Sequence, residues 1–172
     1  MFIVVTGGSG SGKSSYAEKQ VLDFGEGRRY YIATMQCLDE ESKKRVQRHR
    51  AMRADKHFVT LECPTDLHKV SVENDSIVLL ECMSNLTANE YFDGHPHTPQ
   101  EVADKIMTGV CRLKKQCAHL IVVTNEVFSD GVPYDTFTKD YVSCLGKINA
   151  SMAKEADKVV EVVYGIPLEY SV

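Results

Sequence analysis

A glycine-rich segment close to the N-terminus constrains the fold of this chain most strongly. Residues 7–14 read Gly-Gly-Ser-Gly-Ser-Gly-Lys-Ser and directly follow the apolar run Phe2-Ile3-Val4-Val5. The segment matches G-x-x-x-x-G-K-[ST], in which glycines let backbone N–H groups turn inward around phosphate oxygens. The strand-like run before it and the helical stretch 14–22 after it are the context that this motif requires. They favour a phosphate-binding loop over a simple glycine turn.

Each position of the loop has a physical task. Lys13 supplies a compact cation for the β- and γ-phosphates, and Ser14 offers a hydroxyl to Mg²⁺ at the start of a helix, where anions are favoured. We expect the phosphates of a nucleoside triphosphate to be held by Gly7, Gly8, Ser9, Gly10, Ser11, Gly12, Lys13 and Ser14.

Strand-like runs and helical stretches alternate along the chain. Strands are predicted over residues 2–6, 29–34, 57–62, 76–82, 119–124 and 158–164, and helices over 14–22, 39–53, 99–116 and 136–156, with Gly146 a candidate interruption of the last. Residues 76–82 are almost continuously apolar, which is typical of a central parallel strand. The alternation predicts an α/β fold of the P-loop NTPase (RecA-like) kind, a mostly parallel sheet with helices on both faces, in a single domain over residues 1–172. The segment Gly165-Ile166-Pro167 is expected to end the sheet.

Composition narrows the class of partner. The chain has 20 Lys and Arg against 24 Asp and Glu, a net charge of −4, which argues against nucleic acid as a partner. No stretch has the length of a membrane span, and no secretory leader is recognisable. The six cysteines form no C-x-x-C pair, so we expect reduced thiols, no structural zinc site and a cytoplasmic protein.

A basic stretch carries a second candidate site. Arg45, His49 and Arg53 are spaced i, i+4 and i+8, so they line one face of a helix if the helix over 39–53 extends that far. Neighbouring cations favour neutral imidazole, which is a nucleophile, and guanidinium groups bind phosphate oxygens. The stretch is interpreted either as a histidine that attacks phosphorus or as a solvated basic helix face. A nucleic-acid patch is a weaker third interpretation, because no aromatic residues are interleaved.

Polar residues follow several of the predicted strands, where ligands of open α/β sheets bind. Glu81 stands where an acid reaches Mg²⁺ or a bound water, although aspartate is more usual there. Glu62 could accept hydrogen bonds from a base edge such as that of guanine. Each could equally be a surface glutamate that ends a strand. Asn125 and Glu126 could hold a second substrate or cap the following segment.

The loop Asp93-Gly94-His95-Pro96-His97-Thr98-Pro99 contains two histidines. A solvated turn is favoured over a metal site, because no acidic or cysteine partner stands at ligand spacing in the sequence.

Taken together, these motifs resemble the bifunctional adenosylcobinamide kinase/adenosylcobinamide-phosphate guanylyltransferases of cobalamin biosynthesis, nearly from end to end. The segments that carry the resemblance are Thr6-Gly7-Gly8 with Ser11-Gly12-Lys13-Ser14, Tyr31-Ile32-Ala33-Thr34, Arg45-Val46-Gln47-Arg48-His49-Arg50 with Arg53, Thr60-Leu61-Glu62, Leu79-Leu80-Glu81-Cys82, Val123-Thr124-Asn125-Glu126-Val127, Gly131-Val132-Pro133, Ile148-Asn149 and Gly165-Ile166-Pro167-Leu168. One departure is Ser9-Gly10, where many members have alanine-arginine.

The resemblance implies two reactions and their participants. ATP or GTP would phosphorylate the aminopropanol arm of adenosylcobinamide, and His49 would then attack the α-phosphorus of GTP and pass GMP to adenosylcobinamide phosphate. Mg²⁺ is expected to be held by Ser14 and Glu81, and the resemblance implies a homo-oligomer such as a trimer. The nucleotide contacts that it implies, beyond residues 7–14, are Thr34, Met35, Gln36, Arg50, Ala51, Met52, Arg53, Glu62 and Glu81. A small-molecule kinase without guanylyl transfer and a nucleotide-switched binding protein remain alternatives.

Overall fold

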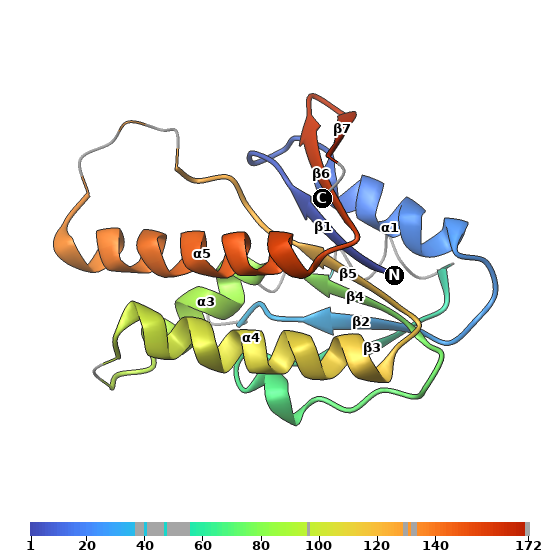
Figure 1. Cartoon of the computed structure of the whole chain (residues 1–172), viewed down its shortest axis with the longest axis horizontal. Helices are drawn as coiled ribbons and strands as arrows, with labels where there is room; N and C mark the ends of the chain where they lie inside the picture. The colour runs from blue at the N-terminus through green and yellow to red at the C-terminus, as the bar shows by residue number, and fades with distance from the viewer. Residues whose placement is uncertain are drawn as a thin grey trace.

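A seven-stranded sheet forms the centre of the computed structural model (Figure 1). The structure describes residues 1–36, 40, 47, 56–95, 97–128, 131 and 134–170. The strands lie in the order β3-β2-β4-β5-β1-β6-β7, and every neighbouring pair is parallel except β6 and β7. The predicted mostly parallel α/β sheet is therefore confirmed.

The elements have the following bounds. The strands are β1 (Phe2–Thr6), β2 (Arg29–Ala33), β3 (Phe58–Glu62), β4 (Ile77–Glu81), β5 (His119–Val123), β6 (Lys158–Val163) and β7 (Ile166–Tyr170). The helices are α1 (Lys13–Asp23), α3 (Met83–Tyr91), α4 (Pro99–Gln116) and α5 (Thr136–Glu155), with a short 3₁₀ turn η2 (Leu67–Lys69).

Alternation of side chains along the strands divides the core into two layers. On β1, Phe2 and Val4 pack with residues of α3, α4 and α5, whereas Ile3 and Val5 pack with Ala17 and Val21 of α1. This is the two-residue period of a strand whose two faces are both covered. Helices thus lie on both faces of the sheet, as the sequence predicted.

Two helices begin where their capping residues lie. Thr98 and Glu101 form a reciprocal capping box ahead of α4, with Pro99 in the first turn, and the Asp135 carboxylate accepts a hydrogen bond from the Thr138 N–H at the start of α5. These caps satisfy backbone donors that the helix leaves free.

α5 runs without interruption through Gly146, so that residue does not break the helix.

Two elements differ from the sequence-based expectation. α3 was not predicted, because its sequence Met-Ser-Asn-Leu-Thr-Ala-Asn-Glu-Tyr is rich in weak helix formers. The sheet also does not end at Gly165-Ile166-Pro167, because β7 pairs antiparallel with β6 and places Pro167 opposite Val162. Proline is tolerated there because β7 is an edge strand.

The helix predicted over residues 39–53 lies largely outside the described residues. Glu40 and Gln47 are described, and both are helical and exposed.

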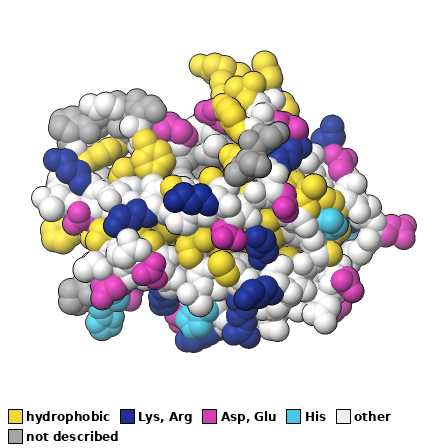
Figure 2. All heavy atoms as spheres, in the orientation of Figure 1, with side chains coloured by type: hydrophobic (Ala, Val, Ile, Leu, Met, Phe, Trp, Pro, Cys, Tyr) yellow, Lys and Arg dark blue, Asp and Glu magenta, His cyan; other side chains and the backbone are white. Residues whose placement is uncertain are grey.

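Hydrophobic side chains gather on the projecting β6–β7 hairpin (Figure 2). Tyr164 is 95% exposed, and the edge strand exposes Ile166, Leu168 and Tyr170 by 62%, 44% and 51%. Within the part of the chain that the structure describes, no helix combines the length and apolarity that crossing a membrane requires.

Candidate functional site

The segments that follow the strands converge at one edge of the sheet. Because β1 to β5 are parallel, their carboxyl ends lie at the same edge, where open α/β sheets bind ligands. The register places Ala33 at the end of β2 opposite both Glu62 of β3 and Glu81 of β4. The glycine-rich loop follows β1 at this edge.

The backbone of the loop requires its glycines. Gly10 and Gly12 have φ angles of 72° and 94°, in the left-handed region that favours glycine. A Cβ atom at Gly7 would lie 2.5 Å from the Val162 carbonyl oxygen and 2.6 Å from Ser11 Oγ. Gly7 is therefore too closely packed for a side chain, whereas Gly10 and Gly12 are required for their backbone conformation.

Polar groups of the loop are arranged as an anion site. α1 begins at Lys13 with Gly12 as its N-cap and no side-chain cap, which leaves backbone N–H groups for a ligand. The buried Ser11 Oγ has no hydrogen-bond partner among the described residues. Lys13 donates a 2.9 Å hydrogen bond to the Gly8 carbonyl, and burial lowers its pKa, although Cys82 and Glu81 oppose this effect. The geometry suits the phosphates predicted for this loop.

Ser14 and Glu81 are joined by a side-chain hydrogen bond beside the loop. Burial raises the pKa of Glu81 to about 7, and the negative charge of Glu18 adds to this effect, whereas the Ser14 hydrogen bond and Lys13 act in the opposite direction. A hydroxyl and a carboxylate oxygen are hard ligands of the kind that Mg²⁺ prefers. The described residues contain no group of three or more His, Cys, Asp or Glu side chains that could hold a metal. The pair therefore suits a cation that also takes ligands from phosphates and water.

Glu18 and Lys56 form a partly buried ion pair near this site. Glu18 lies one turn after Ser14 on α1 and is only 7% exposed, and its carboxylate binds the Lys56 ammonium. The Arg29 guanidinium donates to the Lys56 carbonyl at 3.2 Å. Neither Glu18 nor Lys56 was predicted as a site residue, because nothing local in the sequence connects them.

The residues after β2 and β3 form the other side of the site. Thr34 is buried, and its hydroxyl donates to the carbonyls of Glu81 and Cys82 at 2.8 and 3.0 Å. Met35 is half-buried, whereas Gln36 and Glu62 are exposed. All four predicted residues thus lie at the carboxyl edge of the sheet.

A polar network lies between this side and the loop. Cys82 has φ 73° and ψ 74°, a left-handed conformation that strains a residue with a side chain. Its Sγ lies 3.1 Å from Ser84 Oγ, which accepts a 2.6 Å hydrogen bond from Asn125 Nδ2. The Tyr141 hydroxyl donates to the Ser84 carbonyl at 3.2 Å. Of these residues, only Asn125 had been assigned a site role from the sequence.

Glu126, the neighbour of Asn125, connects β5 to the loop. Its backbone N–H donates to the Gly7 carbonyl at 3.1 Å, and its carboxylate accepts from the Phe128 N–H at 2.8 Å. The Asn125 amide binds Ser84, and Glu126 caps the segment that follows.

The predicted nucleophile lies outside the described residues. The other contacts predicted in that basic stretch also lie outside them. The predicted site residues outside the described part of the chain are Arg45, His49, Arg50, Ala51, Met52 and Arg53.

The histidine-containing loop has an acidic partner that its spacing did not suggest. Asp93 Oδ1 accepts from the His95 N–H at 2.9 Å and lies 3.0 Å from His97 Nε2. These contacts lower the pKa of Asp93. They close the turn ahead of α4.

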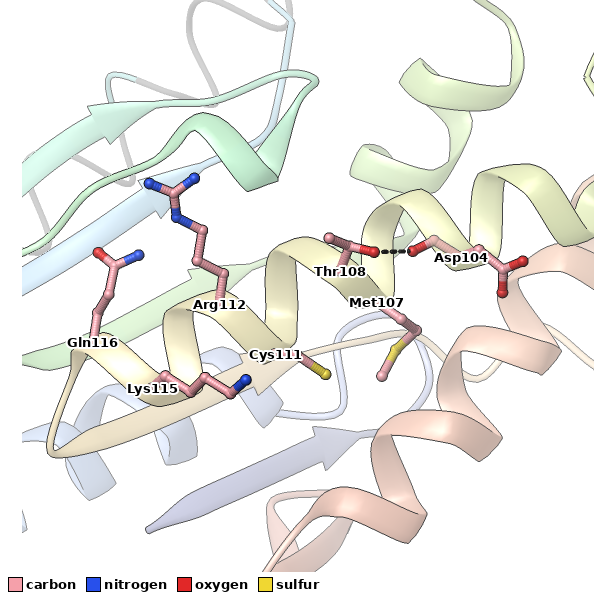
Figure 3. A pocket seen from close by; sticks show the side chains of 7 residues that line it. All are labelled: Asp104, Met107, Thr108, Cys111, Arg112, Lys115 and Gln116. Atoms are coloured by element: carbon pink, nitrogen blue, oxygen red, sulfur yellow. Dashed lines mark hydrogen bonds between the residues drawn. The ribbon is translucent and has the colours of Figure 1, made fainter.

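A shallow hollow of about 770 Å³ lies elsewhere, along one face of α4 (Figure 3). It is lined by Asp104, Met107, Thr108, Cys111, Arg112, Lys115 and Gln116. Since α4 ends at Gln116, just before β5 begins at His119, the end of the helix that lines the hollow lies at the amino-terminal edge of the sheet. The hollow is therefore separate from the loop site.

Comparison with known proteins agrees with this geometry. The sequence model of the family described as cobinamide kinase / cobinamide phosphate guanyltransferase matches residues 3–170. The bifunctional adenosylcobalamin biosynthesis protein CobU of Salmonella typhimurium is 33% identical over 96% of this chain and 97% of its own length. The bifunctional adenosylcobalamin biosynthesis protein CobP of Pseudomonas aeruginosa is 28% identical over 96% and 94% of the two chains.

Solved structures share the fold at low sequence identity. The flagellar accessory protein FlaH from Methanocaldococcus jannaschii gives a TM-score of 0.50 at 11% identity, covering 99% of this chain and 77% of the other. A second solved structure, described as an ATPase domain, superposes with a TM-score of 0.51 at 12% identity, covering 93% and 68%. These likenesses support the P-loop NTPase fold.

Proposed function

Because the chain belongs to the cobinamide kinase / cobinamide phosphate guanyltransferase family, we propose that it phosphorylates adenosylcobinamide and then transfers GMP from GTP to adenosylcobinamide phosphate. The single observation that carries the proposal is the tight phosphate loop, which contains Lys13 and ends at Ser14, whose side chain is hydrogen-bonded to Glu81. Such a loop can bind one triphosphate for both reactions.

In the kinase step, the γ-phosphoryl group of ATP or GTP moves to the hydroxyl of the aminopropanol arm. Lys13 and the backbone N–H groups of the loop stabilise charge on the transferred group. Ser14 and Glu81 would hold Mg²⁺, which supplies neutralisation of charge on the phosphate oxygens. Glu81 binds a cation as the carboxylate, so this role requires that it lose its proton.

In the guanylyl transfer, His49 is the proposed nucleophile. Its neutral imidazole attacks the α-phosphorus of GTP, a P–N bond forms, and the bond to the leaving pyrophosphate breaks. An oxygen of adenosylcobinamide phosphate then attacks the same phosphorus and releases the histidine. The covalent intermediate divides one difficult transfer into two. The spacing of Arg45 and Arg53 around His49 supports this role, because both cations favour neutral imidazole and bind phosphate.

The nucleotide base is proposed to lie beside the segments that follow β2 and β3. Glu62 would accept hydrogen bonds from guanine N1–H and N2–H₂, and residues 34–36 would complete this side of the site. Arg50, Ala51, Met52 and Arg53 are proposed as further nucleotide contacts.

We also propose that residues 1–172 act as one domain and that the protein forms a homo-oligomer, such as a trimer. The exposed hydrophobic side chains of β7 support an assembly, because exposed apolar patches often mark interfaces.

A labelling experiment tests the covalent step. The protein is incubated with α-³²P-labelled GTP and MgCl₂, and we expect a protein-bound label that is acid-labile and alkali-stable. The label should disappear in His49→Asn and persist in the control His57→Asn, because His57 has φ 55° and asparagine tolerates that conformation.

An unlabelled wild-type protein would contradict the guanylylation proposal. Phosphorylation of adenosylcobinamide by that protein would then indicate a kinase alone, and nucleotide binding without either reaction would indicate a switch protein. A label that survives in His49→Asn would assign the nucleophile to another residue.

A further inference from the structure

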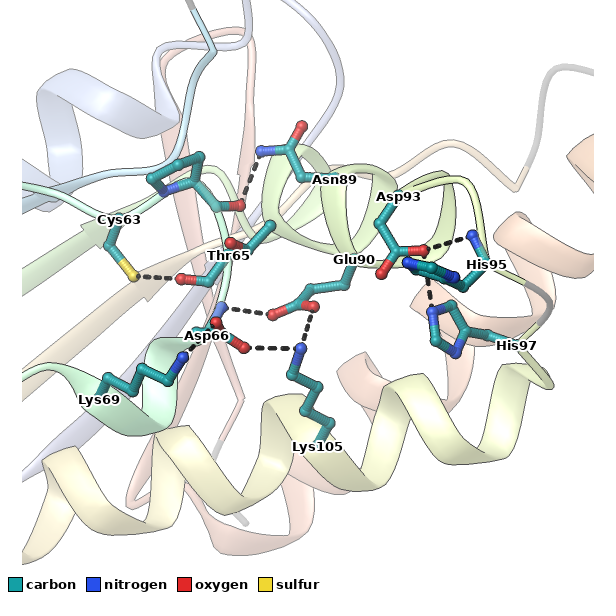
Figure 4. A network of polar contacts seen from close by, with 11 residues as sticks. Cys63, Thr65, Asp66, Lys69, Asn89, Glu90, Asp93, His95, His97 and Lys105 are labelled. Carbon is teal, nitrogen blue, oxygen red and sulfur yellow. Dashed lines mark hydrogen bonds and ion pairs between the residues drawn. The ribbon is translucent and has the colours of Figure 1, made fainter.

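Asn89 of α3 joins two segments of chain that lie far apart in the sequence. Its Nδ2 donates one hydrogen bond to the Thr34 carbonyl and another to the Pro64 carbonyl, each 2.8 Å long. Figure 4 shows the second of these bonds, from Asn89 to the carbonyl of the proline. Both hydrogens of the amide are therefore used in holding the two segments together.

The two carbonyls belong to the segments that carry the proposed base contacts. Thr34 is the first residue after β2 and begins the segment 34–36, and Pro64 lies two residues beyond Glu62. The Cys63 N–H donates to the Ala33 carbonyl at 2.8 Å, which extends the β2–β3 pairing by one residue. Beyond that point, the Asn89 side chain connects the two segments.

The same hydrogen bonds continue to Glu81, a residue of the proposed metal site. The Thr34 hydroxyl donates to the carbonyls of Glu81 and Cys82. Asn89 and Thr34 thus link the ends of β2, β3 and β4 in one chain of hydrogen bonds. A displacement of Thr34 would be transmitted to the backbone of Glu81.

A separate network anchors the neighbouring loop to the fold. Glu90 is only 3% exposed, and its carboxylate accepts from the Asp66 N–H and the Lys105 ammonium, each at 2.6 Å (Figure 4). Hydrogen bonds from Lys105 and Lys69 lower the pKa of Asp66 to about 2. The loop after β3 is therefore already held by charged contacts. The contribution of Asn89 that these contacts do not supply is its hydrogen bond to the Thr34 carbonyl.

We infer that Asn89 is a positioning residue for purine recognition, which holds residues 34–36 and Glu62 at the separation that one base requires. The inference rests on the proposed function, which places those residues at the base. Hydrogen-bonded discrimination depends on donors and acceptors held at fixed positions, because a displaced group leaves a buried polar atom unpaired. Asn89 does not touch the nucleotide in this arrangement, and it acts through Thr34 and Pro64.

The test is the near-isosteric substitution Asn89→Asp, which keeps the shape and removes both donors. Dissociation constants for GTP and ATP are measured by calorimetry with MgCl₂. Their ratio is the readout, because the negative charge that the substitution adds weakens the binding of both nucleotides alike. We expect the preference for GTP over ATP to fall about fivefold, the effect of one net hydrogen bond. Asn89→Ala should lower it similarly, and kcat of the kinase step should change less than KM for the nucleotide.

Thr87→Val is the matched control. Thr87 is buried on the same helix, and its hydroxyl donates to the Met83 carbonyl at 2.9 Å, so the variant loses one hydrogen bond of α3 away from Thr34 and Pro64. It should leave the GTP/ATP ratio unchanged. A fall in the ratio equal to that of Asn89→Asp would overturn the inference, because it would reflect general loosening of α3.

Hydrogen exchange gives a readout that does not depend on base recognition. Amides of residues 31–36 and 60–66 should exchange faster in Asn89→Asp than in Thr87→Val, and equal rates would overturn the inference.

A ratio that Asn89→Asp leaves unchanged would also overturn the inference, and Glu62→Gln then locates the failure. If Glu62→Gln lowers the ratio, the base contacts stand and Asn89 alone has been misassigned. If it does not, or if the wild-type ratio is near one, the proposed base contacts have failed as well.

Discussion

Glu81 illustrates how one residue of the proposed site acquires its properties from its surroundings. Its place after an apolar strand predicted a metal ligand or a surface glutamate, and the structure places it beside Ser14 with a pKa of about 7. Burial is the main cause, and the nearby Glu18 carboxylate adds to it. No local feature of the sequence gives the degree of burial or the distance to Glu18.

The raised pKa of Glu81 predicts a pH-dependent stability. Its ordinary value is 4.5 and its folded value about 7, so between these pH values the native state binds more protons than the unfolded state. The free energy of unfolding therefore falls as pH rises through this window, by at most about 1.4 kcal/mol per pH unit. Glu81→Gln lacks this dependence.

Urea unfolding of both proteins without nucleotide, between pH 4.5 and 8, checks this expectation. The wild type should lose stability relative to Glu81→Gln as pH rises to about 7. A difference between the two proteins that stays constant over the range would contradict the assigned pKa.

Single residues also mark the limit of sequence reasoning at the site. Lys13 and Ser14 were predicted because their motif is local. Asn89 and Cys82 were not, because the first acts through carbonyls 55 and 25 residues away and the second is distinguished by its backbone conformation.

Among the elements, α4 and α5 show how packing overrides helix propensity. Both helices were predicted with nearly correct bounds, and each contains an internal glycine. A Cβ atom at Gly109 of α4 would lie 2.8 Å from Leu67 Cβ and 3.0 Å from the His68 nitrogen. At Gly146 of α5, the nearest atoms belong to the Phe128 ring, at 3.5 and 3.8 Å.

Opposite effects are therefore expected from two identical substitutions. Gly109→Ala should lower the free energy of unfolding by about 1–3 kcal/mol, because η2 must move to accommodate the methyl group. Gly146→Ala makes an ordinary contact and should raise stability by up to about 1 kcal/mol, because alanine favours a helix. Chemical denaturation measures both, and equal effects in the two helices would contradict the packing argument.

For the molecule as a whole, the central question is whether one site serves both proposed reactions. The loop after β1 is the phosphate site that we propose, and its geometry suits that role. Lys13 lies within it, at the start of α1.

Lys13→Ala should therefore impair both reactions. We expect at least about a tenfold loss in adenosylcobinamide phosphorylation and in protein guanylylation, because a cation on the phosphates is removed from each. Both are measured on the same preparation, with Lys19→Ala, an exposed lysine of α1, as the control. Guanylylation that remains at the wild-type level in Lys13→Ala would indicate a second nucleotide site.

The sequence by itself determined the phosphate loop, most strands of the sheet and the family, because a motif, an apolar period and a chain-long resemblance are all readable along the chain. Tertiary structure decided the pKa of Glu81, the connection through Asn89, the ion pair of Glu18 with Lys56, and the edge strand β7. The first three features depend on burial and on contacts between residues far apart in sequence, which no local pattern records. The pairing of β7 with β6 is local, but the glycine and proline at its start had suggested an end to the sheet.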